Sequence, residues 1–292
     1  MKYKYKASII IPTFNRFKLL CMTLDSLSNQ SVDKNDYEVI IIDDGSTDAT
    51  KDILKLYSNK LNLKYFFQEN LGYRAAATRN KGIKMSASEI CIFIDSGILL
   101  ASKAIEEHLK YHEKFGICAV IGYVYGYDEY NENREKLLIL QIDPHKIDEY
   151  IPLIIKNNIL DLREKIFREI GYDMQNWPAP WVIFWSCNIS IKHEILVKIG
   201  MFDEAYNTWG GEDTDLGIAL HVNKIPIRFN PKIETVHFPH DKFKPSITDI
   251  ELKRRTLNKK KYMYRKFGLP EIKTWFDIDT MNLNRYLLND KR

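Results

Sequence analysis

The sequence predicts an α/β fold in which helices flank a mostly parallel central sheet. Apolar, β-branched runs of strand length alternate with amphipathic stretches of helical length, an order typical of right-handed βαβ units. In addition, the run that begins at Glu89 stops abruptly at Asp95, and Gly97 follows. Ligands of open α/β sheets bind beyond the carboxyl ends of the strands. We therefore expect Asp95 at a ligand site, with a helix-capping turn as the alternative.

The first half of the chain contains the strands and helices of this predicted sheet. The first strand is expected to end at Pro12, because proline cannot donate a hydrogen bond to a neighbouring strand. Strands are expected at about 7–12, 37–43, 63–68, 89–95 and 119–125, and helices at about 17–27, 73–84 and 102–115. No GxGxxG motif follows the first strand, which argues against a dinucleotide-binding dehydrogenase.

The pattern changes between residues 126 and 180. A polar stretch at 128–136 is expected to be a loop, and amphipathic stretches follow at 145–156 and 161–170. We interpret the segment as a helical insertion over the sheet edge, either an acceptor-binding lid or a packing subdomain. Strand character resumes over 181–191, followed by expected helices at 193–199 and up to about 222, and short strands at 225–229 and 234–237.

The predicted organisation is one large domain with a C-terminal extension. Residues 1–240 form the domain, in which 1–125 are the nucleotide-binding half and 181–240 the acceptor and catalytic half. Residues 241–292 are a basic extension with a long helix at about 250–267. Such a helix either binds an anionic membrane or nucleic acid, or packs on the domain. The balanced overall charge favours packing.

The composition is that of an ordinary globular protein. The 43 basic and 39 acidic side chains give a net charge of only +4, so charge provides no argument for nucleic acid. The cysteines are widely spaced and form no CxxC pair, which argues against zinc and a disulfide framework (Cys21, Cys91, Cys118 and Cys187). No apolar run is long enough for a signal peptide or a membrane span. We expect a cytoplasmic protein, with weak peripheral contact at the inner face of the membrane left open.

Two further groups of residues lie where a nucleotide would bind. Asp44 follows the second strand next to Gly45, so its carboxylate is placed to accept hydrogen bonds from a base or a ribose, with a helix-capping turn as the alternative. Arg79 lies on the helix after the third strand. A guanidinium there suits diphosphate oxygens, and a solvated helix face is the alternative.

The most specific stretch runs from Trp209 to Asp215. Gly210 and Gly211 place a turn before a helix whose first turn carries Glu212 and Asp213. Acids are favoured at a helix N-terminus, so a charged cap is one explanation. A cap does not require the preceding Trp-Gly-Gly, however. An aromatic surface beside paired carboxylates suits the binding and deprotonation of a sugar hydroxyl.

Two histidines, His237 and His240, flank Phe238-Pro239 near the end of the domain. In an extended segment, residues three apart face opposite ways, so we do not expect both to reach one metal ion. A single histidine is more often structural than a ligand. Asp95 is the partner that would make His237 a metal ligand.

Taken together, these blocks resemble the inverting family 2 glycosyltransferases of the GT-A fold. The resemblance covers about residues 7–240, with the insertion as its gap. Its blocks are Ile9 to Asn15, Ile40 to Asp48, Gly72 to Gly82, Phe93 to Asp95, Ser186 to Ser190, Gly200 to Glu204 and Trp209 to Leu216. The Trp-Gly-Gly-Glu-Asp form is also similar to the galactosyltransferase and chondroitin-synthase-like branches. Any one block is weakly specific, and their order along one chain is strongly so.

The resemblance implies a nucleotide-sugar donor, usually UDP-linked, and a divalent cation, Mn²⁺ or Mg²⁺, on the diphosphate. It implies a nucleotide-binding set, an acceptor-binding set and metal ligands. The nucleotide would contact Pro12, Phe14, Asn15, Arg16, Asp44, Arg79 and Asp95. The acceptor would contact Trp209, Gly210, Gly211 and Glu212, with Asp213 as general base assisted by Glu212. Asp95 and His237 would bind the metal, although Gly97 replaces the last acid of the Asp-x-Asp signature.

The resulting hypothesis is transfer of a UDP-hexose or UDP-N-acetylhexosamine sugar to a glycan, lipid-linked or peptide hydroxyl. The alternative is a non-catalytic sugar-nucleotide or glycan-binding protein on the same fold, which Gly97 suggests. The enzyme hypothesis requires Asp95 and Asp213, which lie far apart in the sequence, to meet in one cleft.

Overall fold

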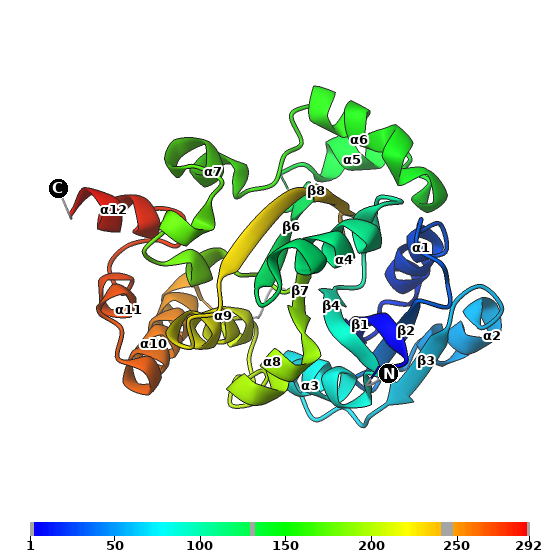
Figure 1. The fold of residues 1–292 in the computed structure, drawn as a ribbon, viewed down its shortest axis with the longest axis horizontal. Helices are drawn as coiled ribbons and strands as arrows, with labels where there is room; N and C mark the ends of the chain where they lie inside the picture. Colours follow the sequence, from blue (N-terminus) through cyan, green and yellow to red (C-terminus); the bar gives the residue numbers. More distant parts are fainter. Residues whose placement is uncertain (1–2, 129–131, 241–247, 291–292) are drawn as a thin grey trace.

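A computed structural model describes residues 3–128, 132–240 and 248–290 of the chain. Its described residues form an eight-stranded sheet with the order β3-β2-β1-β4-β7-β6-β8-β5 (Figure 1). The strands are β1 Tyr5–Thr13, β2 Tyr37–Asp43, β3 Leu63–Phe67, β4 Ser88–Ile94, β5 Ile98–Leu100, β6 Ala119–Tyr125, β7 Asn188–Lys192 and β8 Ile227–His237. The predicted α/β class with a mostly parallel sheet is confirmed.

Strand direction decides which residues meet at one edge of the sheet. β3, β2, β1 and β4 are mutually parallel, and β7 is antiparallel to both β4 and β6. β8 pairs in parallel with β6. The C-terminal ends of β1, β2, β4, β6 and β8 therefore lie at the same edge as the N-terminal end of β7. Side chains from both halves of the chain come together there.

Helices cover both faces of the sheet (Figure 1). Two buried hydrophobic clusters lie on the two faces of the sheet. Successive side chains of β1 point to opposite faces, so Ile9 and Ile11 belong to the first cluster and Ile10 to the second. The first cluster is shared with α1 Phe17–Leu27, α2 Ile53–Tyr57 and α4 Ala104–Phe115. The second is shared with α3 Ala75–Met85, α5 Arg134–Ile139, α6 Ile147–Lys156, α7 Glu164–Ile170, α8 His193–Ile199, α9 Glu212–Val222, α10 Asp249–Phe267, α11 Pro270–Thr274 and α12 Leu283–Asn289.

The helical insertion packs on the end of the sheet formed by β6 and β8. Phe167 of α7 stacks on Phe229 of β8 with 4.1 Å between ring centroids. At its other end, the carbonyl of His145 accepts a hydrogen bond from Asn29, just after α1, at 2.9 Å. The insertion therefore joins two distant parts of the domain. Its role as an acceptor lid stays a prediction.

Several boundary predictions were wrong. The stretch 128–136, predicted as a loop, contains the start of α5 at Arg134, and 129–131 lie outside the described residues. The strand predicted over 181–191 begins only at Asn188, because the apolar residues before it form a 3₁₀ turn, Pro180–Ile183, buried against α9. The two short strands predicted near 225–237 are one strand, β8, with an irregularity opposite Gly122. No sequence pattern predicted the short β5, α11 or α12.

The C-terminal extension is part of the packed molecule. Met263 of α10 is buried, and the Trp275 ring lies 5.5 Å from that of Trp181. The ammonium of Lys260 is buried and donates to the carbonyl of Trp275. These contacts support the interpretation of the basic helix as one that packs on the domain. No helix among the described residues is long and apolar enough to cross a membrane.

A fully buried hydrogen-bond chain joins α4 to β7. His112 Nε2 lies 2.8 Å from Ser190 Oγ, which lies 2.8 Å from His108 Nδ1, and His108 Nε2 lies 3.0 Å from Asn188 Oδ1. A consistent assignment has each Nε2 as a donor, so both imidazoles are neutral. Asn188 and Ser190 belong to the block 186–190 of the family resemblance, which therefore has a structural role.

The two buried histidines of this hydrogen-bond chain should make the stability of the protein sensitive to acid. Burial lowers the pKa of His108 to about 3 and that of His112 to about 4. The unfolded chain therefore binds more protons as the pH falls below about 6.5, and each histidine should cost about 2 kcal/mol of unfolding free energy between pH 7.5 and pH 5. Between pH 7.5 and pH 5, the unfolding free energy of His108→Gln, measured by urea denaturation, should fall by about 2 kcal/mol less than that of the wild type. An equal fall in both proteins would contradict the assignment of His108 as a buried neutral imidazole.

Candidate active site

The loops after β1 and β2 form one side of the site. Asn15 Oδ1 accepts a hydrogen bond from the Thr47 backbone N–H at 2.7 Å, and the Asn15 N–H donates to Ser46 Oγ at 2.8 Å. Gly45 has φ of +89°, and a Cβ there would lie 2.5 Å from the backbone nitrogen of Asn70. These two hydrogen bonds tie the loops after β1 and β2 together. Gly45 allows the second loop to lie close to the backbone of Asn70. The exposed ring of Phe14 lies at their rim.

The two acids at the end of β2 have different roles. Asp43 is fully buried and accepts from the Ser46 N–H at 2.8 Å and the Tyr65 hydroxyl at 2.6 Å, so it is the turn-forming residue. Asp44 Oδ1 accepts from Arg74 at 2.6 Å and Gln68 at 2.7 Å. Asp43 therefore accounts for the turn, and binding of a base or a ribose by Asp44 stays a prediction. Arg74 and Gln68 orient Asp44 at the edge of the sheet.

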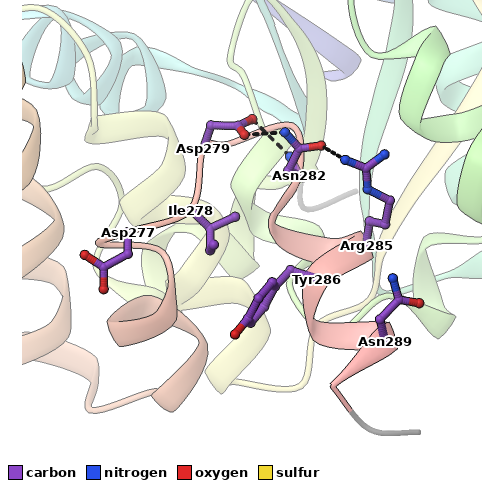
Figure 2. A pocket seen from close by; sticks show the side chains of 7 residues that line it. All are labelled: Asp277, Ile278, Asp279, Asn282, Arg285, Tyr286 and Asn289. Carbon is purple, nitrogen blue, oxygen red and sulfur yellow. Dashed lines mark hydrogen bonds between the residues drawn. The ribbon is translucent and has the colours of Figure 1, made fainter.

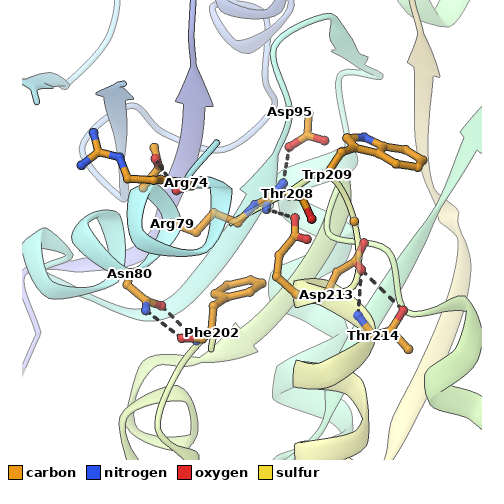
Figure 3. A network of polar contacts seen from close by, with 12 residues as sticks. Arg74, Arg79, Asn80, Asp95, Phe202, Thr208, Trp209, Asp213 and Thr214 are labelled. Carbon is orange, nitrogen blue, oxygen red and sulfur yellow. Dashed lines mark hydrogen bonds and ion pairs between the residues drawn. The ribbon is translucent and has the colours of Figure 1, made fainter. Parts of the chain in front are cut away.

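Arg79 links the two halves of the chain. Its guanidinium lies 2.9 Å from Asp95 Oδ1, just after β4, and 3.0 Å from Glu212 Oε1, at the start of α9 (Figure 3). The Arg79 and Glu212 side chains are buried, whereas that of Asp95 is 41% exposed. Burial alone would lower the pKa of Arg79, but the charges of Asp95 and Glu212 outweigh it and raise that pKa. Asp95 and Glu212, which are far apart in the sequence, thus share one guanidinium, and Asp213 is the residue after Glu212.

Two glycines shape the loop that leads into α9. Gly210 and Gly211 have φ of +82° and +102°, values that L residues rarely adopt. At Gly211 a Cβ would also lie 2.9 Å from the ring of Tyr206, so neither the conformation nor the space admits a side chain. The loop leaves the ring of Trp209 62% exposed.

The three acids in the first turn of α9 point to three different partners. Glu212 binds Arg79, and its Oε2 is buried without a hydrogen-bond partner among the described residues. Asp213 is partly exposed, and its Oδ1 accepts from the Thr214 N–H at 2.7 Å. Asp215 accepts from Tyr206 at 2.9 Å and from Lys266 at 2.7 Å. Among the residues that the structure describes, Asp213 is therefore the acid of this turn that forms no ion pair.

The carboxylate of Asp213 has a pKa shifted toward neutrality. Burial and, next, the charge of Glu212 raise the pKa of Asp213 to about 7, against the opposing charge of Arg79. A base works best when its pKa lies near the working pH. This shift suits a carboxylate that must accept a proton near neutrality.

His237 lies at the end of β8, where its backbone pairs with Ile98, three residues after Asp95. The expectation that His237 and His240 face opposite ways was wrong, because β8 ends at His237 and the ring centroids are 5.1 Å apart. His240 Nδ1 lies 3.1 Å from the Phe238 carbonyl, and its Nε2 lies 2.6 Å from Arg16 Nη1. Arg16 is thus anchored beside the site.

The described residues contain no group of three or more His, Cys, Asp or Glu side chains arranged to hold a metal ion. Asp95 and His237 supply two ligands at most. Any cation there needs further ligands from a bound molecule.

Sequence reasoning missed an aromatic group at the same edge. Tyr127 follows β6, and its ring lies 5.2 Å from that of Trp185 and 5.4 Å from that of His237. Burial, together with the charges of Cys187, Asp213 and Asp95, raises the pKa of Tyr127 well above its ordinary value. Gly126 directly follows β6 and Asp128 follows Tyr127, so the combination of a glycine and an acid after a strand was the available signal.

Two hollows lie outside the strand-end residues. One, of about 340 Å³, is lined by C-terminal residues from Asp277 to Asn289 (Figure 2). The other, of about 500 Å³, lies beside α9 and is lined in part by Asn80, Asp203 and Lys266.

The side chain of Asn80 donates to the carbonyl of Phe202 and accepts from its N–H, both at 2.9 Å, which ties α3 to the block 200–204 (Figure 3).

Comparison with known families decides the classification. The model for glycosyl transferase family 2 matches residues 8–196, more than half of the chain. The chain belongs to glycosyl transferase family 2. Residues 168–241 of this family 2 chain also match the N-terminal domain of galactosyltransferase. The predicted resemblance, including its galactosyltransferase-like branch, is confirmed.

Individual relatives agree with this assignment. The family 2 chain is 34% identical over 242 residues to validoxylamine A glucosyltransferase of Streptomyces hygroscopicus subsp. jinggangensis, covering 80% of this chain and 56% of that protein. It is 31% identical over 222 residues to chondroitin synthase of Pasteurella multocida, covering 73% and 22%. The chain thus spans about half the length of the first relative and less of the second.

A solved structure, S. aureus TarS residues 1–349 in complex with UDP-GlcNAc, superposes with a TM-score of 0.65 at 18% identity, covering 93% of this chain and 71% of TarS. The GT-A fold predicted for this family 2 chain is therefore confirmed.

Proposed function

We propose that the chain is an inverting glycosyltransferase that moves a sugar from a UDP-hexose or UDP-N-acetylhexosamine to an acceptor hydroxyl. The observation that carries the proposal is the Arg79 bridge between Asp95 and Glu212, the residue directly before Asp213. A donor bound at the strand ends would then face a base across one cleft. Family membership supports a nucleotide-sugar donor, and TarS, with the same fold, binds UDP-GlcNAc.

The donor nucleotide would lie on the loops after β1 and β2. Asp44, oriented by Arg74 and Gln68, would accept hydrogen bonds from the base, and the exposed Phe14 would cover it beside Pro12. Asn15 holds the two loops in register. Arg16, beside His240, provides a cation on the diphosphate side. The direct contact of Arg79 with diphosphate stays a prediction, since its guanidinium already donates to two carboxylates.

On the acceptor side, Asp213 would remove the proton of the attacking hydroxyl. The hydroxyl oxygen then forms a bond to the anomeric carbon, the bond from that carbon to the diphosphate oxygen breaks, and the configuration inverts. Trp209 offers an exposed aromatic face for the acceptor sugar. The unpartnered Glu212 Oε2 offers an acceptor for another sugar hydroxyl.

A divalent cation, Mn²⁺ or Mg²⁺, fits the residues present only if it is shared with the donor. Asp95 uses one carboxylate oxygen for Arg79, its side chain is 41% exposed, and His237 is the last residue of β8, beside the turn after Asp95. Such cations require about six ligands, so diphosphate and water must supply the remainder. When bound, the cation would neutralise charge on the leaving UDP.

Donor binding tests this proposal. UDP with Mn²⁺ should raise the melting temperature of the protein, because a ligand of the native state stabilises it. Mn²⁺ without UDP should have little effect, and EDTA should weaken UDP binding by about tenfold or more. GDP-sugars serve as the comparison. Absence of any nucleotide-dependent shift would contradict the proposal, whereas binding without hydrolysis or transfer would favour the non-catalytic alternative that Gly97 suggests.

A further inference from the structure

A lysine of the C-terminal helix holds the loop that carries Trp209. Lys259 Nζ lies 3.3 Å from the carbonyl oxygen of Thr208 and 2.8 Å from that of Gly210, and it also donates to the carbonyl of Trp209 between them. An ammonium group has three N–H donors, and here three consecutive carbonyls accept them. All of its hydrogen-bonding capacity is therefore directed to one short loop.

The loop is shaped around this side chain. Three carbonyls in a row can converge on one atom only if the chain curls tightly, and the positive φ values of Gly210 and Gly211 provide that curl. A Cβ on Gly211 would lie 3.3 Å from Lys259 Cδ, so the lysine stem packs directly on the backbone. Glu212 and Asp213 attract the ammonium and oppose the lowering of its pKa by burial.

The lysine directly precedes the part of α10 that is anchored to the rest of the molecule. Met263 is buried in the core, and Lys260 donates to the Trp275 carbonyl. Two turns further on, Lys266 lies 2.6 Å from Asp203 and 2.7 Å from Asp215 of α9. Because this part of α10 is packed on the domain, Lys259 can hold the loop in one position.

We propose that Lys259 is a positioning residue that holds Trp209 at the distance from Asp213 that an acceptor sugar requires. The C-terminal helix α10 is then part of the acceptor side and not an appended basic tail. This inference rests on the proposed function, since it assigns Trp209 and Asp213 to the acceptor. Loss of the ammonium would free three carbonyls and let the glycine-rich loop move.

Hydrogen exchange of the full chain tests the proposal without any acceptor. We expect Lys259→Met to raise exchange in peptides covering residues 205–212 by about tenfold or more, as the loss of hydrogen bonds to a charged group allows. Acrylamide should also quench tryptophan fluorescence more strongly, since Trp209 is the most exposed tryptophan. Lys259→Arg, which keeps the donors, should restore most of the protection. Lys261→Met, an exposed position on the same helix, is the matched control.

The outcomes separate a local role from a general one. Faster exchange confined to residues 205–212, with the UDP-induced rise in melting temperature unchanged, supports the proposal. Unchanged exchange in this loop overturns it, and so does faster exchange spread over the whole chain, which would show a merely structural lysine. Failure of the proposed function would appear separately, as a wild-type protein that binds no UDP, and would leave the exchange result intact.

Discussion

Asp213→Asn is expected to lower the rate of sugar transfer by about 10²–10⁴-fold, the range that a general base contributes. Asparagine has nearly the same shape and still accepts the hydrogen bond that the Thr214 N–H donates to Asp213, but it cannot take a proton at neutral pH. UDP binding should change by less than about twofold, because the residues proposed to hold the nucleotide follow β1, β2 and β4. The measurement is kcat with a UDP-sugar, alongside a UDP titration.

The pH dependence gives this assignment a second test. Because the pKa of Asp213 is raised to about 7, wild-type turnover should increase as the pH rises through neutrality. A carboxylate with a raised pKa in the folded state stabilises the protein below its unfolded pKa and loses that contribution as the pH rises through the folded pKa. The variant should therefore melt at the same or a higher temperature than the wild type at pH 8. Asp52→Asn, on the surface, is the control. Turnover of Asp213→Asn close to that of the wild type would exclude Asp213 as the base.

The strands of the nucleotide-binding half were predictable because their burial patterns are simple. β2 is buried along its whole length, so its apolar run has abrupt ends at Tyr37 and Asp43, and the prediction matches both. The run from Trp181 to Phe184 is equally apolar, yet it forms a 3₁₀ turn because α9 packs on it. Hydrophobicity reports burial, and burial in a short apolar run does not distinguish a strand from a tight turn.

The candidate site was predictable where a residue type and a turn occur together. Asp95 and Asp213 each lie beside a glycine turn, and the structure brings their segments together. The sequence did not separate the structural Asp43 from the available Asp44, because that difference comes from Tyr65 and Arg74 on other elements. No sequence pattern marked Lys259 as a residue of the site, since the loop carbonyls that it contacts lie 49–51 residues away in the sequence. Contacts between distant elements leave no local pattern.

Replacing Arg79 is expected to have the largest effect on stability. Arg79→Met would leave the buried carboxylate of Glu212 without its counter-ion, and breaking a buried pair in this way costs about 3–5 kcal/mol. Transfer should fall as well, because the same guanidinium sets the separation of the donor and acceptor sides. Lys84→Met, at an exposed position on the same helix, should leave both quantities close to those of the wild type.

The cause of the instability can be separated from lost packing by a second substitution. Adding Glu212→Gln to Arg79→Met removes the uncompensated buried charge, so the double variant should recover much of the unfolding free energy that the single variant loses in urea denaturation. An unfolding free energy that is the same in the single and the double variant would show that Arg79 acts by packing alone.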